Sequence, residues 1–234
     1  MQVRKIDYQK LEDRATRLLE SGRLRQAERI LCGLLKQDPQ SVPAHFHLAR
    51  VYTRMKSYSK ALSHAQEVMR CNPNEPNVNL NLAIIYESLE KYTLAFRHYE
   101  AELLQNPDNV ETLWNAGRLY FKKKRWKKAS QLLRRCFDIG YLFEIEDTLY
   151  KLGYCFFKLK DSRSYVEIYR RYLQMVPDCG WAAANLGCRL FSLKHYHGAA
   201  YWLSIAQQVG TKASVRNELA RARRMASKGV INKN

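Results

Sequence analysis

Small and apolar residues recur along this chain with a period of about 34 residues. A small residue occupies the same register six times, at Ala15, Ala49, Ala83, Gly117, Gly153 and Gly187. The steps between these positions are equal, except that the step from Gly117 to Gly153 is longer by two. Twelve positions after each of them come Ala27, Ala61, Ala95, Ala129, Tyr165 and Ala199. A fixed period of this length indicates a repeat architecture in which each repeat is one supersecondary unit.

Each period has room for two helices and two short turns. From the second repeat on, a ring or a leucine follows the small residue by three positions, at Tyr52, Tyr86, Tyr120, Phe156 and Leu190. That spacing places both residues on one helix face. Proline closes four units, at Pro39, Pro73, Pro107 and Pro177, because it lacks an N–H and restricts the residue before it. The pattern predicts an all-α array of hairpins that bury their apolar faces by stacking on one another.

These spacings resemble those of the tetratricopeptide repeat (TPR) family. The best matches are LNLAIIYESLEKYTLAFRHYEAELLQNP in residues 80–107 and LWNAGRLYFKKKRWKKASQLL in residues 113–133. The resemblance covers residues 8–211 and implies a right-handed superhelix, an α-solenoid of about 13 helices. It also implies a protein that holds another molecule and does not catalyse a reaction.

The expected boundaries follow from this register. Residues 1–7 lead into the array, and a helix capped by Ser214 closes it. The six repeats are expected at 8–41, 42–75, 76–109, 110–145, 146–179 and 180–213, followed by the capping helix at 214–228 and a flexible tail at 229–234.

Two departures from the pattern bear on packing. The junction at residues 136–147 is two residues longer than the others and lacks the proline, so we expect a kink there. The fifth repeat carries Tyr165, Tyr169 and Tyr172 where small or medium apolar residues are usual. We therefore expect looser or shifted packing in that repeat.

Charge divides the chain into two dissimilar halves. The formal net charge is +18, yet residues 1–117 hold 16 Lys and Arg against 14 Asp and Glu, whereas residues 118–234 hold 24 against 8. A field of this kind attracts acidic proteins, nucleic acid or anionic lipid without choosing among them. No run of about 18 apolar residues occurs, so we expect no signal peptide, no membrane span and a cytoplasmic protein with reduced cysteines.

The sequence contains no motif for catalysis or for a cofactor. The ten glycines are scattered and form no phosphate-binding loop. The histidine pairs His45/His47 and His195/His197 are two residues apart, which on a helix turns them to different faces and disfavours joint metal ligation. We predict a non-enzyme with no cofactor, no metal and no small-molecule substrate.

The TPR resemblance implies that the first helix of each hairpin lines a concave groove. The residue two positions before the small residue then faces this groove, at Asp13, His47, Asn81, Asn115, Lys151 and Asn185. The three asparagines resemble the ladder in the TPR domain of O-GlcNAc transferase, whose amides hold the backbone of an extended peptide. An amide offers both a donor and an acceptor, so it can hold a peptide group of any sequence. His47 and Lys151 interrupt the ladder, and asparagine also suits a solvated helix face.

Rings and cations occupy the neighbouring groove positions. They are Phe46, Leu80, Trp114 and Tyr150, then Arg50, Arg118 and Tyr154, then Phe121, Phe157 and Phe191 with Lys122 and Lys158. Such a surface suits a ligand that is both apolar and acidic. For Phe121, Phe157 and Phe191, packing between hairpins is an equally good interpretation.

A basic run, KKKRWKK at residues 122–128, spans the turn of the fourth hairpin. It is either a solvated turn or part of a docking patch for an acidic partner or phosphates, formed by Lys122, Lys123, Lys124, Arg125, Lys127, Lys128, Arg134, Arg135, Arg170 and Arg171. Two functions fit the sequence. One is a scaffold or assembly chaperone that binds an extended or helical segment of a protein partner, and the other is an adaptor for RNA or a ribonucleoprotein. Peripheral docking on an anionic membrane is a third possibility.

Overall fold

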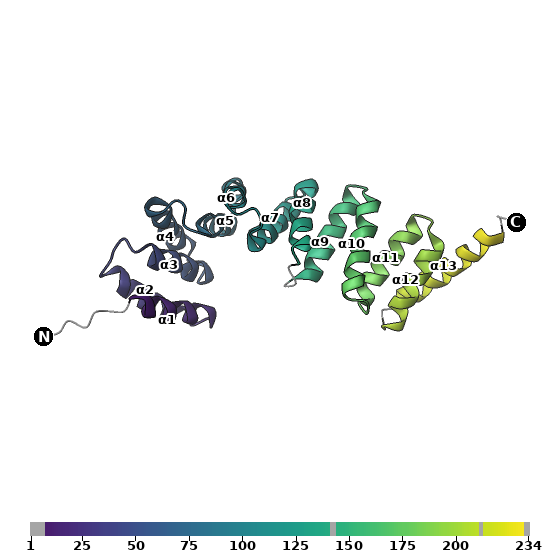
Figure 1. The fold of residues 1–234 in the computed structure, drawn as a ribbon, viewed down its shortest axis with the longest axis horizontal. Coiled ribbons are helices and arrows are strands. Elements are labelled where there is room, and N and C mark those ends of the chain that lie inside the picture. Colours follow the sequence, from purple (N-terminus) through teal and green to yellow (C-terminus); the bar gives the residue numbers. More distant parts are fainter. Residues whose placement is uncertain (1–7, 141–143, 211–212, 232–234) are drawn as a thin grey trace. The chain divides into compact units, whose positions relative to one another are not determined.

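The computed structural model describes residues 8–140, 144–210 and 213–231, and within them it contains thirteen helices and no strand (Figure 1). The helices are α1 (Tyr8–Glu20), α2 (Leu24–Leu35), α3 (Val42–Arg54), α4 (Tyr58–Cys71), α5 (Val78–Ser88), α6 (Tyr92–Gln105), α7 (Val110–Lys122), α8 (Trp126–Asp138), α9 (Ile145–Lys158), α10 (Ser162–Met175), α11 (Gly180–Ser192), α12 (Tyr196–Gln208) and α13 (Ala213–Ile231). The all-α helical repeat fold expected from the sequence is confirmed. The superhelical hand stays a prediction.

The chain forms two units, Met1–Ala116 and Gly117–Asn234, with the boundary inside α7. In the first unit, α1 packs on α2, α3 on α4 and α5 on α6, and each pair also contacts the next through α2 with α3 and α4 with α5. Leu31, Leu48 and Ile85 are completely buried in its core. Burying such a side chain stabilises the fold by about 1.5–3 kcal/mol. The unit therefore depends on contacts between successive hairpins as well as within them.

The second unit continues the same pattern. Helix α8 packs on α9, α9 on α10, α10 on α11, α11 on α12 and α12 on α13. Leu133, Leu152, Ile168 and Leu203 are completely buried. Helix α13 covers the last hairpin with the apolar face expected for it, because Leu219 and the neighbouring alanines on that side are buried.

The repeated small residue marks the closest approach of two helices. A Cβ added to Gly117, Gly153 or Gly187 would lie within 2.8 Å of a side chain on the second helix of the same hairpin, that of Leu133, Tyr169 or Leu203 respectively. In the fifth repeat the large ring of Tyr169 lies against Gly153 and is only 2% exposed. The ring fills the volume that the glycine leaves, and the looser or shifted packing expected for this repeat stays a prediction.

Each hairpin turn contains one residue in the left-handed region. These residues are Gly22, Lys56, Glu90, Lys124, Lys160 and Lys194, with φ between 58° and 77°. The register is constant, so the turn geometry and not the residue type determines this conformation. Five of the six turns therefore hold a side chain where glycine would fit without strain.

The C-terminal helix differs from its expected limits. It begins at Ala213, so Ser214 is its second residue and not its cap, and it continues through Ile231, three residues beyond the expected end. Gly229 does not stop it, because a single glycine costs only about 1 kcal/mol in a helix. The centre of the junction expected to kink, at residues 141–143, lies outside the described residues, as do the lead-in at 1–7 and the last part of the tail at 232–234.

Candidate partner-binding surface

Four rings from three helices form an aromatic cluster in the second unit. The Phe121 ring meets Trp126 edge-on with centroids 5.4 Å apart, and Tyr154 lies 5.5 Å from both. Tyr150, one turn earlier on α9, lies 6.4 Å from Tyr154 and is 50% exposed. Three of these residues, Phe121, Tyr150 and Tyr154, were expected in the groove. The structure brings them together, because α7 and α9 are the first helices of successive repeats.

Cations lie over these rings. Lys158 Nζ is 5.3 Å from the Tyr154 centroid, and Lys151 Nζ is 5.8 Å from that of Phe121 while also pairing with Asp147 on its own helix. Arg189 lies 5.5 Å from the Phe157 ring and donates a 2.6 Å hydrogen bond from Nη2 to Ser162 Oγ. Each cation–ring contact contributes about 0.5–1 kcal/mol at an exposed site. The surface therefore combines apolar area with fixed positive charge.

Phe121, Phe157 and Phe191, for which groove and packing roles were both open, have different surroundings in the structure. Phe121 packs on Trp126 and Phe191 packs on Tyr196 with centroids 5.5 Å apart, in both cases on the first ring of the following helix. Phe157 has Ser162 at that position, where no ring can cover it, and it is 52% exposed. Packing explains much of Phe121 and Phe191, whereas Phe157 is open to a ligand.

The ladder residues are less free than their register suggests. Asn115 and Asn185 are partly exposed, and each donates from Nδ2 to a backbone oxygen four residues earlier, Glu111 O or Trp181 O, at 2.9 Å. Asn81 is half-buried and its Nδ2 is buried without a hydrogen-bond partner among the described residues. Each of the Asn115 and Asn185 amides keeps its carbonyl oxygen as an acceptor and its second Nδ2 hydrogen as a donor for a ligand.

His47 and Lys151 interrupt this row, as the sequence indicated. His47 Nε2 lies 3.4 Å from Thr16 Oγ1, and burial, followed by the nearby charge of Arg50, lowers the pKa of its imidazole. A neutral ring is then favoured near neutral pH. Lys151 is occupied by its pair with Asp147.

The remaining predicted groove residues are split between the units. Phe46, Arg50 and Trp114 belong to the first unit and are half-buried, with Phe46 against the edge of the core. Arg118 is half-buried and Lys122 exposed in the second unit. The exposed rings of the second unit are therefore the part of the predicted groove that is most accessible.

The basic patch is partly neutralised. Arg134 pairs with Glu167 at 2.5 Å, and Arg171 pairs with Asp138 at 2.7 Å. In each pair the two residues belong to the second helices of adjacent repeats. The other members of the patch are exposed, apart from the half-buried Lys123.

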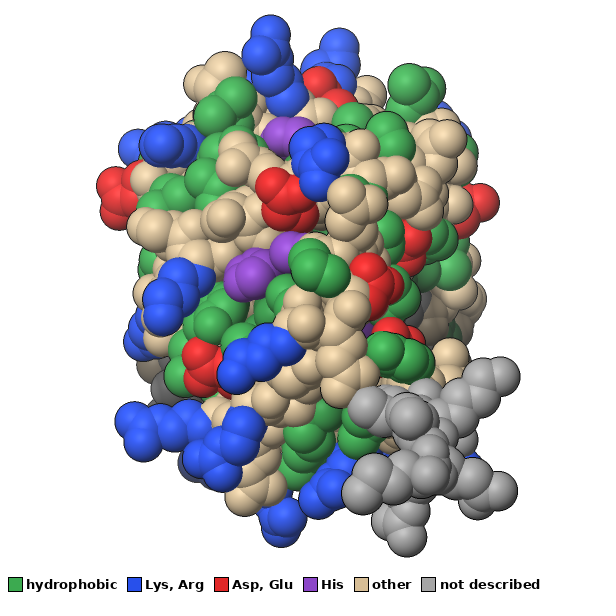
Figure 2. All heavy atoms as spheres, turned by 90° about the vertical axis from the view of Figure 1, so that its left-hand side faces the viewer, with side chains coloured by type: hydrophobic (Ala, Val, Ile, Leu, Met, Phe, Trp, Pro, Cys, Tyr) green, Lys and Arg blue, Asp and Glu red, His purple; other side chains and the backbone are tan. Residues whose placement is uncertain are grey.

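The charge difference seen in the sequence coincides with the two units, since Gly117 is uncharged. The first unit has nearly equal numbers of acidic and basic residues, and both signs are interspersed on the end of the molecule shown in Figure 2. The second unit carries 24 basic residues against 8 acidic ones. The second unit therefore carries the more positive electrostatic potential.

Two cysteines of the second unit, Cys136 and Cys155, are completely buried. Burial raises the pKa of the Cys136 thiol to about 11 and that of Cys155 to about 12, so both are protonated near neutral pH. Within the described residues no group of three potential metal ligands occurs. In the same part of the chain, none of the helices has the length and apolar character needed to cross a bilayer.

Comparison with known protein families identifies the repeat. Family models described as tetratricopeptide repeats match residues 18–85, 80–136 and 147–178, which together are more than half of the chain. The chain belongs to the TPR family. Members of this family are in general non-enzymatic scaffolds for protein–protein interaction. No sequence among the curated proteins matches the chain significantly.

Solved structures share this TPR fold. YrrB, described as a TPR protein with an unusual peptide-binding site, has a TM-score of 0.64 at 13% identity, over 82% of this chain and 97% of its own. A TPR protein from Parabacteroides merdae has 0.58 at 15%, over 92% and 98%. MamA from Desulfovibrio magneticus RS-1 has 0.60 at 17%, over 74% and 97%. Identities this low establish the fold alone.

Arg189 was missed by the sequence interpretation. It follows the small residue Gly187 by two positions, a register not included among the groove positions, and it contacts both Phe157 and Tyr165. The sequence did offer a signal for it. Arg189 lies about one repeat after Phe157, which has Ser162 and not an aromatic residue five positions later.

Proposed function

We propose that this TPR chain is a non-enzymatic scaffold that holds an acidic segment of a protein partner on the first-helix surface of its second unit. The observation that carries this proposal is the pair of half-exposed rings Tyr150 and Phe157, accompanied by the cations Lys158 and Arg189. Exposed rings beside fixed cations suit a segment that contains both apolar and acidic side chains. The described peptide-binding site of YrrB is consistent with this class of ligand.

The chemistry of the surface favours an extended or helical peptide. Rings supply apolar contact area, Lys158 and Arg189 supply charge, and the carbonyl of Asn185 accepts a hydrogen bond from a peptide N–H. A role as an assembly chaperone would use the same surface, with release of the segment when the partner assembles. A cytoplasmic location belongs to this proposal.

The test uses two exposed-ring variants. Tyr150→Ala with Phe157→Ala removes the rings, and Tyr201→Ala, whose ring on α12 is 59% exposed, is the matched control. Tagged proteins are incubated with RNase-treated extract, and bound proteins are quantified by mass spectrometry. We expect specific partners to be retained by the wild type and the control and to be lost from the double variant. Equal retention by both variants would refute the proposal.

A nucleic-acid adaptor is the second candidate, favoured by the 24 basic residues of the second unit and by the cations over its rings. Bases stack on exposed rings and phosphates pair with lysine and arginine. If the proteins retained from untreated extract disappear on RNase treatment in all variants alike, the adaptor function replaces the scaffold. Flotation with anionic vesicles tests membrane docking in the same preparations.

A further inference from the structure

A hollow lies between α10 and the turn joining α11 to α12, outside the surface used above. Its volume is about 830 Å³. One wall is a face of α10 that includes Arg163, Val166 and Arg170, and the other includes Leu190 and Leu193. A hollow of this size lies within the range of about 300–1,000 Å³ seen for sites that enclose a ligand. We call it the outer hollow.

The outer hollow keeps a positive charge after its internal pairs are counted. Glu167 on its wall is paired with Arg134, and Arg171 is paired with Asp138. Arg163 and Arg170 are exposed, and among the described residues neither has an ion-pair partner. Two arginines are therefore available to a ligand.

The floor between these arginines is apolar. Leu190 is 4% exposed, and Val166 and Leu193 are half-buried. Arg163 and Arg170 are seven residues apart on α10, which separates them by about 10 Å along the helix axis. Two acidic side chains four residues apart in an extended segment lie on one face and span about 13 Å, which the long arginine side chains can reach, and the side chain midway between them lies on the same face. The hollow thus presents two arginines with apolar side chains and the paired carboxylate of Glu167 between them.

We propose that the outer hollow binds an acidic peptide segment of a protein partner, with two carboxylates on Arg163 and Arg170 and an apolar side chain on the floor between them. The ligand is a peptide and not a nucleic acid because His195 supplies the single ring among the described residues that line the hollow, whereas a nucleic-acid strand is held by several rings on which successive bases stack. Guanidinium groups bind carboxylates through paired hydrogen bonds, which favours acidic side chains.

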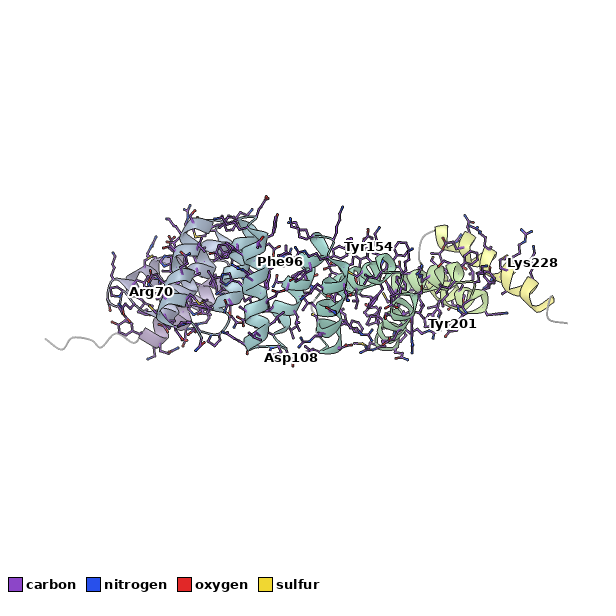
Figure 3. All side chains as sticks on the ribbon, turned by 90° about the horizontal axis from the view of Figure 1, so that it is seen from above. Arg70, Phe96, Asp108, Tyr154, Tyr201 and Lys228 are labelled. Carbon is purple, nitrogen blue, oxygen red and sulfur yellow. The ribbon has the colours of Figure 1, made fainter. Side chains whose placement is uncertain are left out.

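This site is separate from the first-helix surface. The outer hollow is lined by α10 and the start of α12, whereas Tyr150, Tyr154 and Phe157 lie on α9. Figure 3 labels Tyr154 of the first-helix surface, and the hollow adjoins that surface because its lining residue Ser162 accepts the hydrogen bond from Arg189 beside Phe157.

The test measures binding of a short fluorescein-labelled peptide with two glutamates four residues apart and a leucine midway between them. We expect Arg163→Glu with Arg170→Glu to weaken binding at least about tenfold, because each charge-assisted pair is reversed. The matched control, Arg223→Glu with Arg224→Glu on the exposed face of α13, changes the net charge equally and is expected to alter the affinity less than about twofold. Thermal unfolding verifies that the variants fold.

Two further measurements distinguish the contribution of the apolar floor to peptide affinity from that of the arginines, and binding in the hollow from binding on the first-helix surface. Val166→Ser is expected to weaken binding of the leucine peptide but not of a peptide with serine in its place. Tyr150→Ala with Phe157→Ala is expected to leave binding unchanged. The proposal would be overturned if both charge-reversal variants lost the same affinity, or if no binding occurred up to about 1 mM peptide. It would also be overturned if oligo-uridylate displaced the peptide and this displacement required Arg163 and Arg170.

Discussion

At the scale of single residues, the close approach of helices in the fifth repeat depends on Gly153. We predict that Gly153→Ala lowers the free energy of unfolding by about 2 kcal/mol, because its new methyl group would overpack the core. The added Cβ would lie 2.6 Å from Tyr169 Cε2. Gly33→Ala is the matched control, since nothing lies within 4 Å of its Cβ, and helix propensity should raise stability there by about 0.5–1 kcal/mol. Urea denaturation measures both changes, and an unchanged midpoint for Gly153→Ala would contradict the packing described.

Two histidines in equivalent positions of the first unit give it a pH dependence. His64 stacks on Tyr52 and His98 stacks on Tyr86, with His64 Nδ1 2.8 Å from His45 Nδ1 and His98 Nδ1 2.9 Å from Asn79 Oδ1. Burial is the main cause that lowers the pKa of both imidazoles, with the nearby His45 and Arg97 adding to it respectively. The folded state therefore disfavours the charged rings.

The sign of the pH effect follows from these lowered pKa values. Stability is complete above the unfolded pKa of about 6.5 and is lost as pH falls through the folded pKa, since the unfolded chain binds the protons more readily. We predict that unfolding free energy falls between pH 7.5 and 5.5, and falls less when His64 and His98 are both replaced by Gln. Urea titrations at the two pH values provide the measurement. A pH dependence of equal size in the wild type and the variant would exclude these rings as its source.

At the scale of elements, the hairpin turns place lysine in a conformation that costs free energy. Lys160 has φ of 59°, a region that costs an L-residue roughly 1–2 kcal/mol. We predict that Lys160→Gly raises the free energy of unfolding by roughly 0.5–1 kcal/mol, after the larger entropy of the unfolded glycine chain is subtracted. Lys160→Val should lower it by at least about 1 kcal/mol, because a β-branched side chain is least compatible with positive φ. Chemical denaturation distinguishes these outcomes, and the same sign for both substitutions would contradict the turn geometry.

The helices themselves were largely predictable because their signals are local and repeat six times. The small residue, the ring three positions later and the closing proline all report contacts within one hairpin. Sequence reasoning failed at the limits of α13, and it did not reveal how Tyr169 is accommodated, which depends on the available volume. Gly153 leaves the space that Tyr169 occupies, and recognising this requires the pairing of two residues on facing helices.

At the scale of the whole molecule, the unequal charge of the two units should control association with ligands. We predict that a generic single-stranded RNA binds weakly at low salt and shows no measurable binding at about 150 mM NaCl, because unspecific phosphate contacts release counterions and weaken steeply with salt. Fluorescence anisotropy across a salt series is the measurement. A submicromolar dissociation constant at about 150 mM NaCl would favour the RNA adaptor over the protein scaffold.

The candidate surfaces were only partly predictable, for reasons that differ between residues. The groove register identified Tyr150, Tyr154 and Phe157 as candidates on the first helix of the fifth repeat, because helical periodicity decides which residues share a face. It did not identify Phe157 as the most exposed of Phe121, Phe157 and Phe191. That exposure arises because Ser162 stands five positions later, where the other two are followed by an aromatic residue. It also missed Arg189 and the outer hollow, which arise from residues of adjacent hairpins.

The sequence alone determined the period, the hairpins, the positions of closest helix approach and the difference in charge between the two halves. These properties depend on residue types at fixed local spacings. Tertiary structure decided which rings remain open, which arginines are neutralised by acids of the adjacent repeat, and where a hollow remains between α10 and the α11–α12 turn. Those outcomes depend on how side chains of adjacent hairpins share space and charge, which a pattern along one chain does not specify.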